Sequence, residues 1–289
     1  MLSQLVDAIR DVVPDDAATA LTAGQRPAAG AGVVVRPRGS PTPGAAGNRD
    51  AGAAPRRVSA DGYAVIDAGG WLDLARLARL FGDVPADLYD TGYGSAGTAD
   101  PYVPEGFRCK SLGRLRLHGT EPVAGPREPL YQSREFNPVH GSIARHYQPL
   151  PAEFAAGLAD ALRLFQTVTR LAHDEEVLVQ AQRVTTSTGG VGHPAVEGFH
   201  QDDMDYVGAL LVSRRGLAGG KTLLAADSSG SDLVFAGELE PGQLLVLDDR
   251  RLWHYTSPVR DVAGPGLGHY DVILFGWPSC RRPRSWQLG

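Results

Sequence analysis

Residues 197–202 read Glu-Gly-Phe-His-Gln-Asp, the most informative stretch of the sequence for predicting its fold and site. His200 and Asp202 are two positions apart, so their side chains project from the same face of an extended strand. A third residue able to bind metal, His254, stands 52 positions after Asp202, at the beginning of a later strand-like run. Two histidines and one carboxylate on one side of a metal, with the other side open, form the site of non-haem Fe(II) oxygenases. We therefore predict a metal site at these three residues.

Other polar residues near the motif allow alternatives. His193 lies in a Gly-rich loop seven residues before His200 and could replace His254 as a ligand. Histidines in loops are commonly solvated, which favours His254. Asp248 and Asp249 end a strand-like run shortly before His254, where one of them could orient its imidazole as a hydrogen-bond acceptor.

Short strand-like runs surround this motif. Each is rich in β-prone residues, and Gly, Pro or Asp turns separate them. Because no helix-length segment lies between the runs, a parallel α/β sheet is disfavoured, and a double-sheet jelly roll is the natural antiparallel solution. We therefore predict a mainly β fold with flanking helices (α+β). The runs are 179–188, 206–213, 221–226, 232–239, 243–248, 253–259 and 270–277.

The first part of the chain is predicted to differ from the rest. Residues 1–13 have the pattern of a short amphipathic helix, whereas 14–57 consist mainly of Ala, Gly and Pro, with too little apolar surface to offset the cost of ordering the chain. Order is expected to begin near residue 62. The predicted division is therefore 1–60 for an N-terminal helix and mobile segment, and 61–289 for the folded domain.

Helices are expected at two places within the folded domain. Leucines between 72 and 81 recur at helical spacing just after a strand-like run at 62–66. From Pro151 to Leu171 apolar residues recur every three or four positions, with the proline at the tolerated first turn. This second helix is predicted to pack against the sheet as a buttress.

Composition excludes several classes of protein. The 289 residues include 28 basic and 33 acidic ones, and a net charge of −5 has the wrong sign for neutralising nucleic acid phosphates. The two cysteines, Cys109 and Cys280, can form neither a thiolate zinc cluster nor a disulfide framework. No apolar run approaches the roughly 20 residues of a membrane helix. We expect a soluble cytoplasmic protein without a nucleic acid or membrane partner, whose oligomeric state the sequence does not indicate.

Residues 107–278 resemble the bacterial Fe(II)/2-oxoglutarate dioxygenase family that includes L-isoleucine hydroxylases. The resemblance rests on several motifs in the same order. They are Tyr131-Gln132, Phe136-Asn137-Pro138, Arg145-His146-Tyr147, the stretch 197–202, Gly219-Gly220, and Asp248-Asp249-Arg250 with His254.

The resemblance implies a fold, cofactors and an activity. The fold would be the cupin-like double-stranded β-helix, with His200, Asp202 and His254 as the ligands of Fe(II). The cosubstrates would be 2-oxoglutarate and O2, and the reaction would be oxidation of an unactivated C–H bond of a free L-amino acid or derivative in specialised metabolism. Hydroxylation is the expected outcome. Ring closure, as in formation of a nitrocyclopropane from a nitro amino acid, and desaturation are the alternatives within the same class.

The sequence departs from the family at the residue that binds the far carboxylate of 2-oxoglutarate. Family members usually carry Arg at the start of the last core strand, where this chain has Tyr270. A phenol hydrogen bond contributes only about 1 kcal/mol, whereas burying a carboxylate without a cation costs several. We therefore expect a cation beside Tyr270, with Lys221 as the first candidate and Arg260 as the second.

Four polar residues are expected to bind the amino acid substrate. Glu197 is the candidate for its ammonium group, and Arg145 is the candidate for its carboxylate. Gln132 and Asn137 lie in the same family-like segment and would complete a polar pocket. Each of these residues could instead serve the structure alone, as a loop tie or a surface salt bridge.

One alternative belongs to a different functional class. The absence of the usual Arg at Tyr270 would also fit a metal-binding jelly roll that has no catalytic turnover.

Overall fold

The structure of the chain, a computed structural model, covers most of the predicted folded domain and a short segment before it. The amphipathic helix predicted at 1–13 lies outside the described residues, as does the Ala/Gly/Pro-rich segment up to residue 51. The described residues are 52–87, 89, 108–137, 139–186, 191–262 and 268–279.

The folded part begins before the boundary predicted at residue 61. Helix α2 (Ala54–Asp61) includes residues that were expected to be mobile. Ala54 and Val58 are buried in the core, and the Arg251 guanidinium donates hydrogen bonds to the backbone carbonyls of Ser59 and Ala60 at 3.0 and 3.2 Å. These contacts come from a segment about 190 residues later in the chain, so local composition alone did not reveal them.

A large, mostly antiparallel sheet forms the centre of the fold. Its strand order is β1-β11-β7-β14-β5-β2-β3, and β4 pairs with β2 in parallel. Long pairings hold the middle of this sheet together, because β14 pairs with β5 on one side and with β7 on the other. The strands are β1 (Tyr63–Asp67), β2 (Arg108–His118), β3 (Glu121–Ala124), β4 (Gln148–Pro149), β5 (Val177–Thr186), β7 (Tyr206–Arg215), β11 (Gln243–Asp248) and β14 (Gly268–Trp277).

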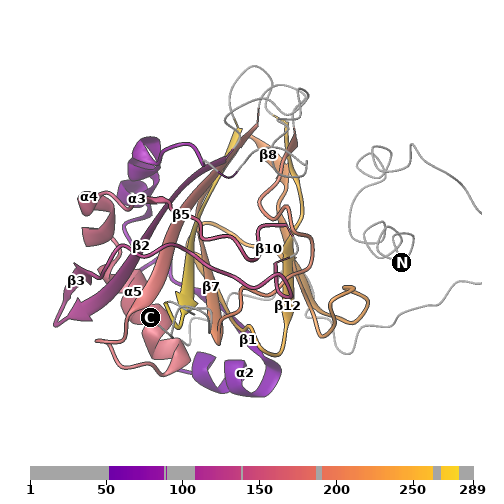
Figure 1. The fold of residues 1–289 in the computed structure, drawn as a ribbon, viewed down its shortest axis with the longest axis horizontal. Coiled ribbons are helices and arrows are strands. Elements are labelled where there is room, and N and C mark those ends of the chain that lie inside the picture. The colour runs from indigo at the N-terminus through magenta and orange to yellow at the C-terminus, as the bar shows by residue number, and fades with distance from the viewer. Residues whose placement is uncertain are drawn as a thin grey trace, which may run out of the picture.

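Two three-stranded sheets complete the β structure, with the orders β10-β9-β12 and β6-β13-β8. They lie on the side of the large sheet that faces away from α3, α4 and α5 (Figure 1). The large sheet and the two smaller sheets face each other as in the predicted jelly roll, and each predicted run overlaps a strand. The strands are β6 (Val191–Gly192), β8 (Leu217–Gly219), β9 (Lys221–Ala225), β10 (Leu233–Glu238), β12 (Trp253–Thr256) and β13 (Val259–Asp261).

The helices cover the opposite face of the large sheet. They are α3 (Leu74–Leu80), the short 3-10 helix η2 (Phe81–Asp83), α4 (Ala152–Ala156) and α5 (Ala159–Thr169). The single helix predicted from residue 151 is therefore two helices, with a break at Gly157 and Leu158. Its apolar stripe is nevertheless buried against the large sheet, and the Phe165 ring stacks on Phe275 of β14 at 5.3 Å. The predicted buttress is confirmed.

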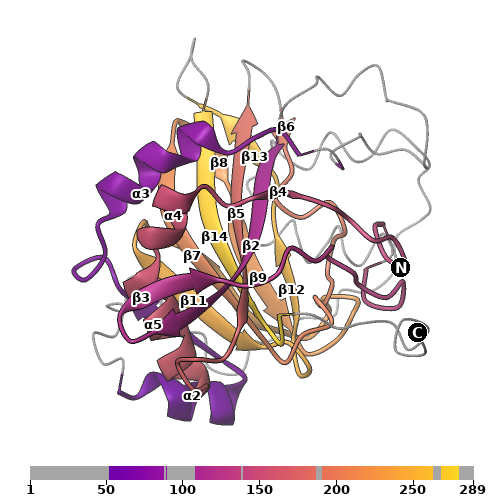
Figure 2. The ribbon, with the colours of Figure 1, turned by 60° about the vertical axis from the view of Figure 1, so that its left-hand side comes forward.

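Strand β2 was not predicted, although it pairs with β5 over eight residues and runs beside it in Figure 2. Its sequence, RCKSLGRLRLH, contains four cationic residues and lacks the β-branched character expected of a strand. The structure explains this composition. Leu115 and Leu117 pack into the core below the helices, whereas Arg108 and Lys110 line a cavity between the sheets.

Among the described residues, no helix combines the length and the apolar character that crossing a membrane requires.

Candidate metal centre and cavity

The two predicted histidine ligands are joined through their backbones. The His200 N–H donates to the His254 carbonyl oxygen at 3.1 Å, and the His254 N–H donates back to the His200 carbonyl at 3.0 Å. His254 lies on β12, and His200 follows Gly198, whose φ of 74° lies in the left-handed region that favours glycine. The pairing brings the two imidazole centroids to 4.3 Å.

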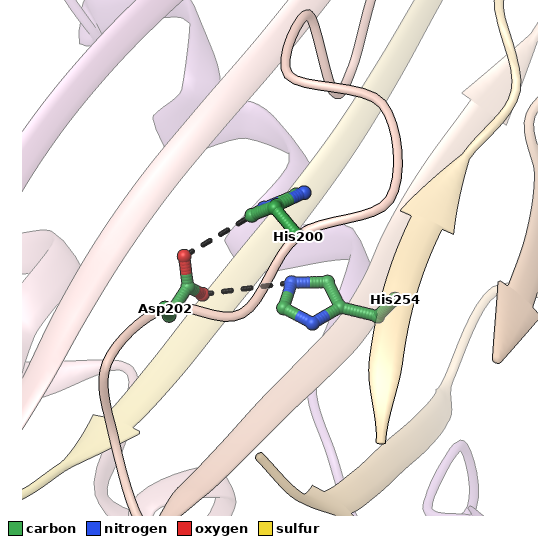
Figure 3. A group of neighbouring side chains, drawn as sticks. All are labelled: His200, Asp202 and His254. Atoms are coloured by element: carbon green, nitrogen blue, oxygen red, sulfur yellow. Dashed lines mark ion pairs between the residues drawn. The ribbon is translucent and has the colours of Figure 1, made fainter. Parts of the chain in front are cut away.

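Asp202 completes a compact group with these histidines (Figure 3). One carboxylate oxygen lies 3.7 Å from His200 Nε2, and the other lies 3.7 Å from His254 Nε2. These separations are too long for hydrogen bonds but suit atoms that surround a common ion. All the potential ligand atoms lie within 4.8 Å of one another. His193, the alternative ligand, is not part of this group among the described residues.

Each imidazole has its Nδ1 occupied by a neighbour, which leaves Nε2 for a metal. His200 Nδ1 lies 2.8 Å from the Gly198 carbonyl oxygen, a pure acceptor, so Nδ1 carries the proton. His254 Nδ1 faces Asp249 Oδ1 at 3.4 Å. Metal-bound histidines generally place their second nitrogen against a carbonyl or carboxylate in this way. The group therefore fits a divalent ion.

Of the two candidate orienting carboxylates, Asp249 faces His254. Its other oxygen accepts hydrogen bonds from the backbone N–H groups of Asp202 and Met204, at 2.9 and 3.0 Å. Asp248 instead accepts from the Arg250 N–H. Burial raises the pKa of Asp249. Burial lowers the pKa of His254, but the charges of Asp249 and Asp202 outweigh it, and the net shift is upward. Asp249 thus connects two of the three predicted ligands.

A chain of hydrogen bonds supports Asp202 from the loop before α4. Gln132 Nε2 donates to Asp202 Oδ1 at 2.8 Å. Gln132 Oε1 in turn accepts from Asn137 Nδ2 at 3.0 Å and from a guanidinium nitrogen of Arg145. Gln132, Asn137 and Arg145, which were predicted to contact substrate, therefore form a network beside Asp202. Gln132 orients the Asp202 carboxylate, and Asn137 and Arg145 hold Gln132 in place.

Glu197 is partly buried near the same network. Its carboxylate accepts from Asn137 Nδ2 at 3.2 Å and lies 3.4 Å from His140 Nδ1. Burial alone would raise the pKa of Glu197, but the hydrogen bond with His140 and the charges of His200 and Arg108 hold it well below its usual value. Glu197 is therefore ionised at neutral pH.

The triad opens into a cavity lined by residues of the large sheet and of the smaller β10-β9-β12 sheet. All four residues predicted to bind substrate line it, as does Tyr270. Sequence reasoning missed Arg108 and Lys110, which lie on the unpredicted strand β2. The further lining residues include Gln180, Gln182, Thr222, Leu245, Leu247, Thr256, Val272 and Leu274.

The structure separates the residues predicted to bind 2-oxoglutarate. Tyr270 is 3% exposed, and burial raises its pKa to about 12, so it remains a neutral phenol. Neither Lys221 nor Arg260 is among the described residues that line the cavity. On β9 the lining residue is Thr222, and successive side chains of a strand point to opposite faces.

The fold and the site together define a class of protein. A jelly roll whose interior gathers two histidines and one carboxylate, beside an open polar cavity, is typical of non-haem Fe(II) oxygenases.

Comparison with known proteins places the chain within this class. The family model for 2OG-Fe dioxygenases matches residues 98–276, more than half of the chain. The chain belongs to this family and is an Fe(II)- and 2-oxoglutarate-dependent dioxygenase that uses O2.

Relatives and solved structures agree with this assignment. The chain is 30% identical to 3(1)-hydroxy-L-isoleucine 4-dioxygenase of Pantoea ananatis over 193 residues, which cover 61% of this chain and 74% of that protein. A bsmA homologue from Methylobium petroleophilum has a TM-score of 0.59 at 22% identity, covering 78% of this chain and 92% of that one. IDO from Bacillus thuringiensis has a TM-score of 0.55 at 12% identity, covering 78% and 97%. These two structures support the fold.

Proposed function

We propose that the protein hydroxylates an unactivated C–H bond of a free L-amino acid or a close derivative, as a step of specialised metabolism. The observation that carries the proposal is the cavity beside the triad, where the Glu197 carboxylate and the cations Arg108, Lys110 and Arg145 line one space. Such a cavity suits a small ligand that carries both charges. The named activity of the Pantoea ananatis relative supports an amino acid as that ligand.

The residues have separable roles in this proposal. His200, Asp202 and His254 would bind Fe(II), which together with 2-oxoglutarate and O2 supplies the oxidising chemistry, with succinate and CO2 as the other products. Asp249 orients the His254 imidazole, and Gln132 orients the Asp202 carboxylate.

Two further residues would place the ligands. Ionised Glu197 would bind the ammonium group of the amino acid. Tyr270 would donate its phenol O–H to the far carboxylate of 2-oxoglutarate, because its buried hydroxyl stays protonated. Arg145, whose guanidinium donates to Gln132 and to the Tyr147 hydroxyl, would hold the substrate-side loop in place.

The test is a product analysis with free amino acids. Protein loaded with Fe(II) is mixed with 2-oxoglutarate, O2 and a panel of L-amino acids that includes nitro and N-hydroxy derivatives. We expect one member to gain a single oxygen atom by mass, with one succinate formed per product. Reaction with peptides or carrier-bound aminoacyl groups alone would rule out a free amino acid substrate.

The same experiment separates the alternative outcomes. Desaturation and ring closure both remove two hydrogen atoms, so the product would lose mass, and NMR would distinguish a double bond from a ring. A metal-binding jelly roll without turnover would form no succinate with any substrate, an outcome that membership of a dioxygenase family disfavours.

A further inference from the structure

Lys110 places an ammonium group without a counter-ion at the cavity wall. It lies on β2, is partly buried and lines the cavity. Among the described residues, the contact of its side chain is with the Tyr147 ring, whose centroid is 5.3 Å from Nζ. No hydrogen bond or ion pair to a described residue satisfies the ammonium, which can form three donor bonds.

The other charges at this end of the cavity have partners. The Arg108 guanidinium forms an ion pair with buried Asp87 at 2.8 Å. The Arg145 guanidinium donates to Gln132 and Tyr147, as described above. Arg108, Lys110 and Arg145 bring three positive charges to this end of the cavity, whereas Asp87 and Glu197 bring two negative ones, so the group has one positive charge in excess. A buried charge without a partner is unfavourable unless a ligand supplies the opposite one.

We propose that the Lys110 ammonium binds the carboxylate of the amino acid substrate, while Glu197 binds its ammonium group. This inference rests on the proposed function and assigns the carboxylate to Lys110 in place of Arg145. Both Nη donors of Arg145 are directed at protein acceptors, which leaves only its buried Nε–H without a partner, whereas the Lys110 ammonium lines the cavity with no hydrogen bond to a described residue.

The surroundings of Lys110 favour the amino acid over 2-oxoglutarate as the source of the carboxylate. Lys110 and Glu197 are close enough to interact electrostatically. A zwitterion matches this pair of opposite charges, whereas 2-oxoglutarate carries two negative charges, which Glu197 would repel. Lys110 is also separated from Tyr270 in the sheet, because β5 lies between β2 and β14.

The ionisation of Lys110 is consistent with this role. Burial lowers its pKa to about 8, with the charges of Arg108 and Arg145 acting in the same direction and those of Asp87 and Glu197 opposing them. The side chain therefore stays mostly protonated at neutral pH. A bound carboxylate would offset the cost of its desolvation.

The experiment measures binding to the anaerobic Fe(II) protein with saturating 2-oxoglutarate, by calorimetry. L-Isoleucine and L-isoleucinamide, which lacks the negative charge, serve as probes, and the variants are Lys110→Met and Lys110→Gln. The exposed Arg116→Met on the same strand is the control. We expect wild type and control to prefer the acid, and both Lys110 variants to bind L-isoleucine roughly 10- to 100-fold more weakly. Their affinity for the amide should change little.

Affinity for 2-oxoglutarate, read from its visible charge-transfer band with iron, provides the second measurement and shows that each variant is folded. Unchanged 2-oxoglutarate binding together with lost preference for the acid supports the inference. A retained preference in both variants, or a loss confined to 2-oxoglutarate binding, overturns it. If the wild-type protein shows no measurable binding of L-isoleucine or of any other amino acid in the panel, the proposed function fails. The assignment of Lys110 then fails with it.

Discussion

Gln132 Nε2 donates a hydrogen bond of 2.8 Å to Asp202 Oδ1, and this contact links a loop 70 residues earlier in the chain to the predicted iron site. The contact leaves Asp202 with a fixed orientation toward the two histidines. Residues that support metal ligands in this way affect metal affinity without touching the ion.

Gln132→Ala should therefore weaken Fe(II) binding by roughly 10- to 100-fold. The substitution removes the donor to Asp202 and leaves the Asn137 and Arg145 donors without their acceptor. Equilibrium titration with Fe(II) under anaerobic conditions measures the effect. Glu135→Ala, an exposed position in the same loop, is the matched control and should bind iron as wild type does. Equal affinities for both variants would contradict the supporting role of Gln132.

Asp249 and Asp248 provide a second matched pair. Asp249→Asn removes the negative charge beside His254 Nδ1, and we expect a loss of metal affinity of roughly 10- to 100-fold. Asp248→Asn alters a carboxylate that accepts from the Arg250 N–H and should leave metal affinity unchanged. The measurement is competition with a chelator of known affinity. A comparable loss of metal affinity in Asp248→Asn would show that the loss comes from removing a negative charge near the site and not from the contact between Asp249 and His254.

Tyr270→Phe tests the phenol at the position where the family usually has Arg. The loss of one neutral hydrogen bond should weaken 2-oxoglutarate binding by roughly 5-fold. Because the pKa of Tyr270 is about 12, the effect should be constant between pH 6 and pH 9. The charge-transfer band provides the measurement.

Lys221→Ala and Arg260→Ala are the comparisons for Tyr270. Since Thr222 is the cavity-lining residue of β9, we expect both variants to keep the 2-oxoglutarate affinity of wild type. Disappearance of the band in Lys221→Ala alone would establish Lys221 as the cation that the sequence predicted.

Lys110 should also make stability depend on pH. Burial lowers the pKa of Lys110 from 10.5 to about 8 in the folded protein. Between these two values the unfolded chain binds a proton that the folded chain has released, so the free energy of unfolding rises with pH across this window. Below about pH 8 the full cost of the buried charge is present. At neutral pH, Lys110→Met should therefore be more stable than wild type, by up to roughly 3 kcal/mol.

Urea unfolding at pH 7 and pH 10, without substrate, measures this difference. We expect the advantage of Lys110→Met to shrink between the two conditions, while Arg116→Met shows a difference from wild type that does not vary with pH. The charges that face Lys110 are those of Asp87, Arg108, Arg145 and Glu197. A pH-independent advantage would show that the Lys110 pKa is not lowered.

The sequence predicted the parts of this protein that depend on local patterns. Short apolar runs separated by turn residues predicted the strands of the jelly roll. The spacing of His200 and Asp202 on one face of an extended segment, with His254 at a later strand, gave the group that the structure brings together.

The parts that were missed depend on contacts between distant segments. Strand β2 carries charged residues because one of its faces lines a cavity, which no local pattern reveals. The order of α2 comes from contacts with Arg251, far along the chain. The alternation of charged residues with leucines in Arg114-Leu115-Arg116-Leu117-His118 was an available local signal for β2.

The position of β2 separates two properties of the enzyme. Lys110 and Arg108 stand on a strand that contributes none of the three predicted iron ligands, which come from the 200–202 segment and from β12. Substitutions at these two positions therefore replace none of the three predicted ligands. Substitutions at Arg108 and Lys110 are thus a starting point for changing the substrate that the enzyme accepts while keeping its predicted iron ligands.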